Sequence, residues 1–169
     1  MSGEGSAVVP GPDGERKARR VVVAGMGNEY RRDDGAGPAV AARSADEAPI
    51  TIDVGPVVDP LDLLGRWDGA ELAIVIDAMR SGATPGTVRV VDLTGPSSSP
   101  DATSTHGIGL AGVLRLAQAL DQAPARVVVV GIEGEDFGRG TGLSPAVDAA
   151  LPAAVRRVVE LIKEFQACA

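Results

Sequence analysis

Aromatic residues make up only 2% of the 169 residues, and the chain has a single cysteine. A core without many aromatic rings has to be built from Val, Ala, Leu and Ile. The scarcity also argues against a protein that stacks nucleic-acid bases on aromatic side chains. One cysteine cannot form a disulfide within the chain, which fits a cytoplasmic location. Cys168 lies next to the C-terminus, where chains fray, so we do not expect it to be a nucleophile.

Positive charge and long apolar runs are scarce as well. The net charge of -7 disfavours a phosphate-backbone partner, so we expect no nucleic acid. No apolar run approaches the roughly 20 residues of a membrane span, so we expect no membrane partner. Residues 1–19 lack the apolar centre of a signal peptide and are rich in Gly, Pro and Ser. We therefore expect a flexible extension over 1–19 and one domain over 20–169.

What the chain does contain is an alternation of short apolar runs with helical patterns. Alternation of this kind predicts an α/β fold of three layers, with a twisted, mostly parallel five-stranded sheet between helices on both faces. Residues 87–93 alternate apolar and polar side chains, which is typical of an edge or antiparallel strand. The expected strands are 20–25, 50–55, 72–78, 87–93 and 125–134, and the expected helices are 34–45, 59–67, 106–120 and 143–166. In the last helix, we expect Ser144 to cap the first turn and Pro152 to bend or break the helix.

Five chemically capable side chains fall where the functional site of such a sheet is expected. Ligands bind beyond the carboxyl ends of the parallel strands. Asp33 and Asp34 follow the first strand, Asp53 ends the second as we place it, and Asp77 ends the third. His106, the only histidine, precedes a helix that must start at this same end, because that helix leads into a parallel strand. The topology therefore brings Asp34, Asp77 and His106 together.

A nucleotide-binding interpretation of the first loop is weak. "GMGNEY" begins like a dinucleotide fingerprint, but Tyr30 stands where the third glycine is required. An acid at the end of the second strand, Asp53, would fit the fingerprint, whereas paired acids at a helix start are poor neighbours for a pyrophosphate. Nucleotide binding stays an alternative of low weight.

A metal site is the stronger interpretation of the acids. Two aspartates and a histidine suit divalent Zn, Ni, Mn or Fe, and three protein ligands leave coordination positions open. Simpler roles remain open at this point: Asp34 or Asp33 could cap the helix, Asp77 could cap a turn, and His106 could merely begin a helix. The glycines of the first loop let the chain leave the strand sharply and bring helix and sheet close, and Asn28 is expected to hold the loop.

Five segments between about Arg20 and Glu164 carry a resemblance to a known family. They are "GMGNEYRRDDGAGPAVA", "DVGP" before "DPLDLL", "IVIDAMRSGATPGTV", "STHGIGLAGVLRLA" and "GIEGEDFGRGTGLSPAVDAAL". In this order and spacing, they together resemble the hydrogenase maturation proteases. The resemblance implies a compact α/β protein whose metal ligands are Asp34, Asp77 and His106. The family's first ligand is often Glu, so Asp34 is a shorter variant.

The resemblance also implies an activity. It suggests an endopeptidase that removes a C-terminal peptide from the precursor of a nickel-iron hydrogenase large subunit, with the substrate's nickel as the recognition element. Zn or Cd can also occupy such a site, and we expect a monomer. Asp33 and Asp53 are candidates to assist the attacking water. The main alternative is a non-cleaving protein of the same fold that checks metal insertion.

Overall fold

The computed structural model describes residues 19–48, 53–95 and 107–168. Five strands form one sheet in the order β2-β1-β3-β5-β4, in which only β4 is antiparallel to its neighbour. The strands are β1 (Val21–Met26), β2 (Asp53–Val57), β3 (Leu72–Met79), β4 (Val88–Asp92) and β5 (Arg126–Glu133). The helices are η1 (Arg32–Gly35), α1 (Ala36–Glu47), α2 (Asp62–Trp67), α3 (Gly107–Ala119) and α4 (Pro145–Ala167). The predicted α/β fold and its antiparallel edge strand are confirmed.

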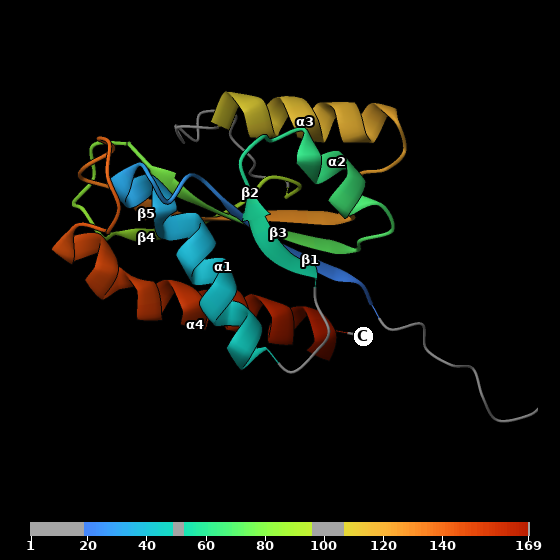
Figure 1. The fold of residues 1–169 in the computed structure, drawn as a ribbon. Helices are drawn as coiled ribbons and strands as arrows, with labels where there is room; N and C mark the ends of the chain where they lie inside the picture. Colours follow the sequence, from blue (N-terminus) through green and yellow to red (C-terminus); the bar gives the residue numbers. More distant parts are fainter. Residues whose placement is uncertain (1–18, 49–52, 96–106, 169) are drawn as a thin grey trace, which may run out of the picture.

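Helices cover both faces of the sheet (Figure 1): α1 and α4 lie on one face, and α2 and α3 on the other. The strands β1, β3 and β5 are buried along almost their whole length, which explains their continuous apolar sequences. Their side chains alternate between the two cores. Ile74 and Ile76 of β3 pack toward α1 and α4, whereas Ala73 and Val75 pack toward α2 and α3.

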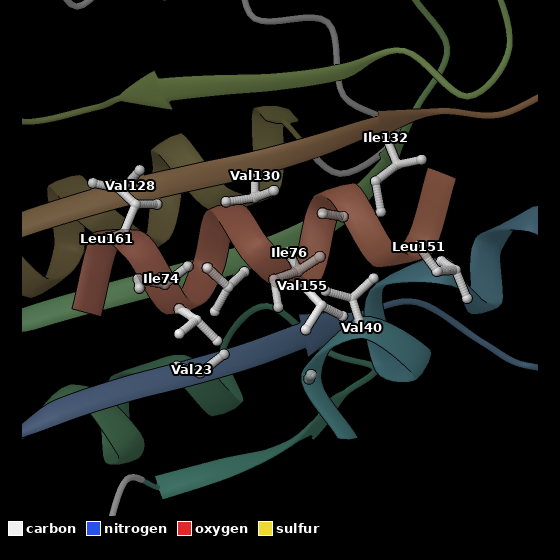
Figure 2. Packing of buried hydrophobic residues seen from close by; sticks show 14 of the residues in the cluster. Val23, Val40, Ile74, Ile76, Val128, Val130, Ile132, Leu151, Val155 and Leu161 are labelled. Atoms are coloured by element: carbon white, nitrogen blue, oxygen red, sulfur yellow. The ribbon is translucent and has the colours of Figure 1, made fainter. Parts of the chain in front are cut away.

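The core between the sheet and α4 is aliphatic, as the low aromatic content requires. Figure 2 shows branched side chains of the central strands, such as Val130 and Ile132, meeting Leu151, Val155 and Leu161 of the helix. All of these side chains are at most 2% exposed. Within the described ranges, no helix is long and apolar enough to span a membrane.

Two predictions about element boundaries are corrected. Within the described residues the second strand runs from Asp53 through Pro56 to Val57, so it ends two residues later than the predicted 50–55; residues 50–52 lie outside the described part. A proline is tolerated there because β2 is an edge strand. Helix α4 continues through Pro152 to Ala167, so the predicted break is wrong, whereas the predicted bend stays a prediction. Leu151 and Val155 on either side of Pro152 are buried against the sheet, which holds the helix together there.

Candidate functional site

The first loop and the start of α1 pack unusually close to the ends of β1 and β3. Gly27 has a φ of 129°, and a Cβ at this position would lie 1.8 Å from the carbonyl oxygen of Asp34. A Cβ on Gly37 would lie 2.2 Å from the carbonyl oxygen of Met26 and 2.6 Å from that of Ile76. Glycine is therefore required at both positions. The close approach, as the sequence predicted, places the acid-bearing turn η1 directly against the carboxyl end of the sheet.

Asp34 is a buried carboxylate at this end, with 6% of its surface exposed. Its Oδ2 accepts the backbone N–H of Asn28 at 2.9 Å, and the Oδ1 of Asn28 in turn accepts the N–H of Tyr30 at 2.9 Å. Asn28 thus holds the loop, as predicted. No group in the described part of the chain donates a hydrogen bond to Oδ1 of Asp34. The carboxylate makes no capping bond to α1, so the capping interpretation is set aside.

Asp77 is the second buried carboxylate, with 1% exposure. It lies in β3 beside Gly131 of β5, one residue beyond Ile76, which is level with Gly25 of β1. Turn η1 packs against β3, so Asp34 and Asp77 come to the same end of the sheet. Because side chains alternate along a strand and Ile76 faces α1 and α4, Asp77 belongs to the face that α2 and α3 cover.

Helix α3 starts at this end as well. Near its beginning, Gly109 lies so close to Pro60, in the loop after β2, that a Cβ would be 3.2 Å from the proline ring. Figure 1 shows α3 running back over the sheet from the end where β1 and β3 finish. The predicted start of this helix at the carboxyl end is confirmed. His106, the residue before it, lies outside the described residues, so its predicted place beside Asp34 and Asp77 stays a prediction.

Asp33 has a different role from its neighbour. It is completely buried, and its two oxygens accept four hydrogen bonds from the loop after β5: the N–H groups of Glu135 at 2.8 Å, Asp136 at 2.9 Å and Ser144 at 2.6 Å, and the Ser144 hydroxyl at 2.9 Å. Burial alone would raise the pKa of this carboxyl, but the hydrogen bonds outweigh burial and hold the pKa below its ordinary value of 3.8. Asp33 therefore joins two loops about a hundred residues apart.

The same network corrects two capping predictions. The Asp33 side chain caps neither η1 nor α1, because every hydrogen bond that its carboxylate accepts comes from the other loop. Ser144 does stand at the N-terminal cap position of α4, but its hydroxyl makes no capping bond. It donates to Asp33 Oδ2 instead. A buried carboxylate is the stronger acceptor, so the serine serves the loop junction.

A further buried carboxylate, Glu133 at the end of β5, was missed by sequence reasoning. It is 3% exposed and accepts the N–H groups of Ser81 and Gly82 at 2.7 and 2.9 Å and the Ser81 hydroxyl at 2.7 Å. Glu133 thereby fixes the loop that follows β3. The sequence did show an acid at the end of an apolar strand. Its hydrogen-bond partners could not be predicted, because they lie some fifty residues away in the sequence.

Asp53 is not part of this site, contrary to the prediction. It does not end β2 but lies four residues before Val57, level with Val22 of β1 and hence with Ala73 of β3. Asp77 lies four residues further along β3, which is about 13 Å along the strand direction. The Asp53 carboxylate instead hydrogen-bonds Arg66 at 2.7 Å, and mainly for that reason its pKa is lowered. The nucleotide interpretation, which needed an acid at the end of β2, loses its support.

Asp53→Asn is therefore expected to leave any activity of the site unchanged. Exposed ion pairs contribute little, so the free energy of unfolding should fall by only about 0.5 kcal/mol. Urea denaturation and a cleavage assay on the same preparation measure both quantities. A loss of activity comparable with that of an Asp77 variant would return Asp53 to the site.

The site as described holds two carboxylates suited to a divalent cation. Within residues 19–48, 53–95 and 107–168, no group of three or more His, Cys, Asp or Glu side chains is arranged to hold a metal ion. The third predicted ligand, His106, is outside these ranges. Asp34 and Asp77 alone supply the hard oxygen donors that zinc, nickel and manganese accept.

Comparison with known proteins gives consistent results. The family model described as hydrogenase maturation protease matches residues 44–161. The hydrogenase expression/formation protein HupD of Rhodobacter capsulatus is 32% identical over 159 residues, covering 89% of this chain and 73% of that protein. The hydrogenase 2 maturation protease of Escherichia coli (strain K12) is 27% identical over 151 residues, covering 86% of this chain and 92% of that protein.

The fold is shared with solved structures of a hydrogenase maturation protease and of an endopeptidase. The [NiFe] hydrogenase maturation protease HybD from Thermococcus kodakarensis superposes with a TM-score of 0.73 at 29% identity, covering 84% of this chain and 98% of that one. A solution structure of an endopeptidase from Escherichia coli gives a TM-score of 0.75 at 25% identity, covering 86% and 93%. The likeness extends over nearly the whole length of each compared chain.

Proposed function

Because the chain belongs to the hydrogenase maturation protease family, we propose that it is the endopeptidase that removes a C-terminal peptide from the nickel-loaded precursor of a nickel-iron hydrogenase large subunit. The observation that supports this function best is that two buried carboxylates, Asp34 and Asp77, lie at the same carboxyl end of the sheet. Burying a carboxylate is costly, and buried acids that gather at the expected binding end of a sheet are typical of functional sites.

In this proposal the metal arrives with the substrate. The carboxylates of Asp34 and Asp77, with the imidazole of His106, engage the nickel of the precursor or a carbonyl beside it. That contact aligns the scissile peptide bond and polarises it toward attack by water. Zn or Cd can bind to the same three side chains in place of the substrate's nickel. The negatively charged carboxylates would attract a precursor that carries the metal cation and would not attract a metal-free precursor, so the site would discriminate between the two.

The structure narrows the choice of general base. Asp33 accepts four hydrogen bonds and has a lowered pKa, so it is a weak acceptor for a further proton. Asp53 lies at the opposite end of the sheet. Oδ1 of Asp34 accepts no hydrogen bond from any described residue, and it is our candidate to take the proton from water.

Incubation of the purified chain with nickel-loaded candidate precursors tests the function. We expect one precursor to lose a C-terminal peptide, which tandem mass spectrometry identifies, while the other precursors keep their mass. A control with the Asp77→Asn variant should release nothing. A stable complex between this chain and a precursor that never loses mass would contradict the proposal and favour a protein that checks metal insertion without cutting.

A further inference from the structure

A hollow lies beside the candidate site, between the loop after β1 and the loop after β5. It has a volume of about 780 Å³ and is lined by Tyr30, Arg31, Phe137, Gly138 and Arg139. We call these five residues the arginine groove. In Figure 1 the two loops lie together at the end of the sheet where β1 finishes. The motif "YRRDD" supplies one wall, and its arginines have no part in the function proposed above.

The walls of the arginine groove are fixed by the backbone. The N–H of Gly140 donates to the carbonyl of Tyr30 at 2.9 Å, and the N–H of Arg32 donates to the carbonyl of Gly140 at 2.9 Å. Asp33 adds its four hydrogen bonds directly behind this junction. A surface held in this way needs little ordering when a ligand binds.

The groove is cationic, although the chain as a whole carries a net charge of -7. Both of its charged residues are arginines. Arg139 is exposed and has no ion pair within the described part of the chain, and Arg31 donates only a long hydrogen bond of 3.4 Å to the carbonyl of Phe137. A third guanidinium, that of Arg80, lies 4.5 Å from the centre of the Phe137 ring.

No acid of the surrounding loops, including the exposed Glu135, forms an ion pair with Arg31 or Arg139 within the described part of the chain. Asp136 accepts the N–H of Gly138 at 2.8 Å and lies 3.9 Å from Arg32. Glu29 lines a separate hollow together with Arg32. The Arg31 and Arg139 guanidinium groups therefore remain available to an outside anion.

We propose that the arginine groove binds an acidic segment of the precursor polypeptide next to the cleavage point. This inference rests on the function proposed above. Arg31 of the groove and Asp34 of the site belong to one turn, in which the N–H of Asp34 donates to the carbonyl of Arg31 at 3.1 Å. A chain whose cleavage point sits at Asp34 and Asp77 passes it within a few residues. The forked guanidinium matches a carboxylate, and the Tyr30 ring, on a residue that is 65% exposed, offers a flat apolar surface beside it.

Charge reversal at Arg139 tests the groove. With the uncleaved, nickel-loaded precursor that the chain cuts as substrate, Arg139→Glu should raise KM on the order of tenfold and leave kcat nearly unchanged. The reason is that the groove binds substrate without touching the reacting bond. Arg139→Gln should have a smaller effect of the same kind. Arg156→Glu is the matched control, since Arg156 is exposed on α4, and it should behave as wild type. Equal KM values for Arg139→Glu and Arg156→Glu would overturn the proposal.

A precursor with its acids near the cleavage point changed to Asn and Gln provides the complementary arm. On that substrate the KM of wild type should rise by the same factor as Arg139→Glu causes on the unchanged precursor. The Arg139→Glu variant should show no further rise in KM. If Arg139→Glu raised KM about tenfold on this substrate too, Arg139 would not act through the precursor's acids, and the proposal would be contradicted.

A peptide probe separates failure of the groove from failure of the enzyme function. A fluorescent octapeptide of Asp-Gly repeats, acetylated and amidated so that only side-chain carboxylates remain, should bind wild type and bind Arg139→Glu on the order of tenfold more weakly. The matching Asn-Gly peptide should not bind. If no precursor is cleaved, the enzyme function fails while this assay still decides on the groove; equal binding of the two peptides would refute it.

Discussion

Asp77→Asn is expected to abolish precursor cleavage, lowering kcat/KM by about a thousandfold or more. The amide has the same size as the carboxylate and stays within β3, but it cannot supply the negative charge that a substrate cation requires. The protein should remain folded, because a buried neutral amide costs less than a buried charge. Asp34→Asn and His106→Ala should cause losses of the same order. Cleavage kinetics with the nickel-loaded precursor, together with circular dichroism, measure both consequences.

The Asp53→Asn variant is the control, because it removes the same charge at the other end of the sheet. Its cleavage rate should equal that of wild type. Full cleavage by Asp77→Asn or by His106→Ala would show that the proposed metal-engaging set is wrong, whatever the function of the chain.

Asp33→Asn is expected to have the largest effect on stability. An amide cannot accept at both positions, so its NH2 group would face either the N–H of Ser144 or the donors from Glu135 and Asp136. The loss of charge-assisted hydrogen bonds in a buried place should lower the free energy of unfolding by about 3 kcal/mol. In a chain of this size that corresponds to a fall in Tm of roughly 6–12 °C. Thermal and urea denaturation measure it.

This stabilisation should depend on pH in a defined direction. The folded-state pKa of Asp33 lies below its ordinary value of 3.8. Its contribution is therefore fully present above the unfolded-state pKa and is lost as the pH falls through the folded-state value. The stability difference between wild type and Asp33→Asn should stay constant at neutral pH and shrink below about pH 4. Asp148→Asn, at an exposed position in the first turn of α4, is the control and should cost about 0.5 kcal/mol. If Asp33→Asn lowered the free energy of unfolding by no more than Asp148→Asn does, the role of Asp33 in joining the two loops would be contradicted.

The sequence was most informative where a pattern is local. The apolar runs of β1, β3 and β5 and the alternation in β4 predicted the sheet, because burial on two faces or on one dictates those patterns. The rule that sites form at the carboxyl ends of parallel strands then predicted that Asp34 and Asp77, more than forty residues apart in the sequence, lie at the same end of the sheet.

What the sequence could not reveal are the long-range partners of polar groups. Asp33 and Asp34 are chemically identical neighbours, yet Asp33 accepts hydrogen bonds from residues 135–144 and Asp34 accepts one from Asn28 in its own loop. Glu133 and Ser144 were undervalued for the same reason. The misplacement of Asp53 has a different cause: residues 50–55 alternate as a strand would, and only the pairing register of β2 shows that Asp53 lies level with the start of β1.

The central claim is that this chain cuts a precursor because its acids engage the nickel that the precursor carries. The most direct test is the intact mass of one precursor, prepared with and without nickel and incubated with equal amounts of the purified chain. We predict that the nickel-loaded sample loses a single C-terminal peptide and that the nickel-free sample keeps its full mass. Equal cleavage of both samples would contradict the claim.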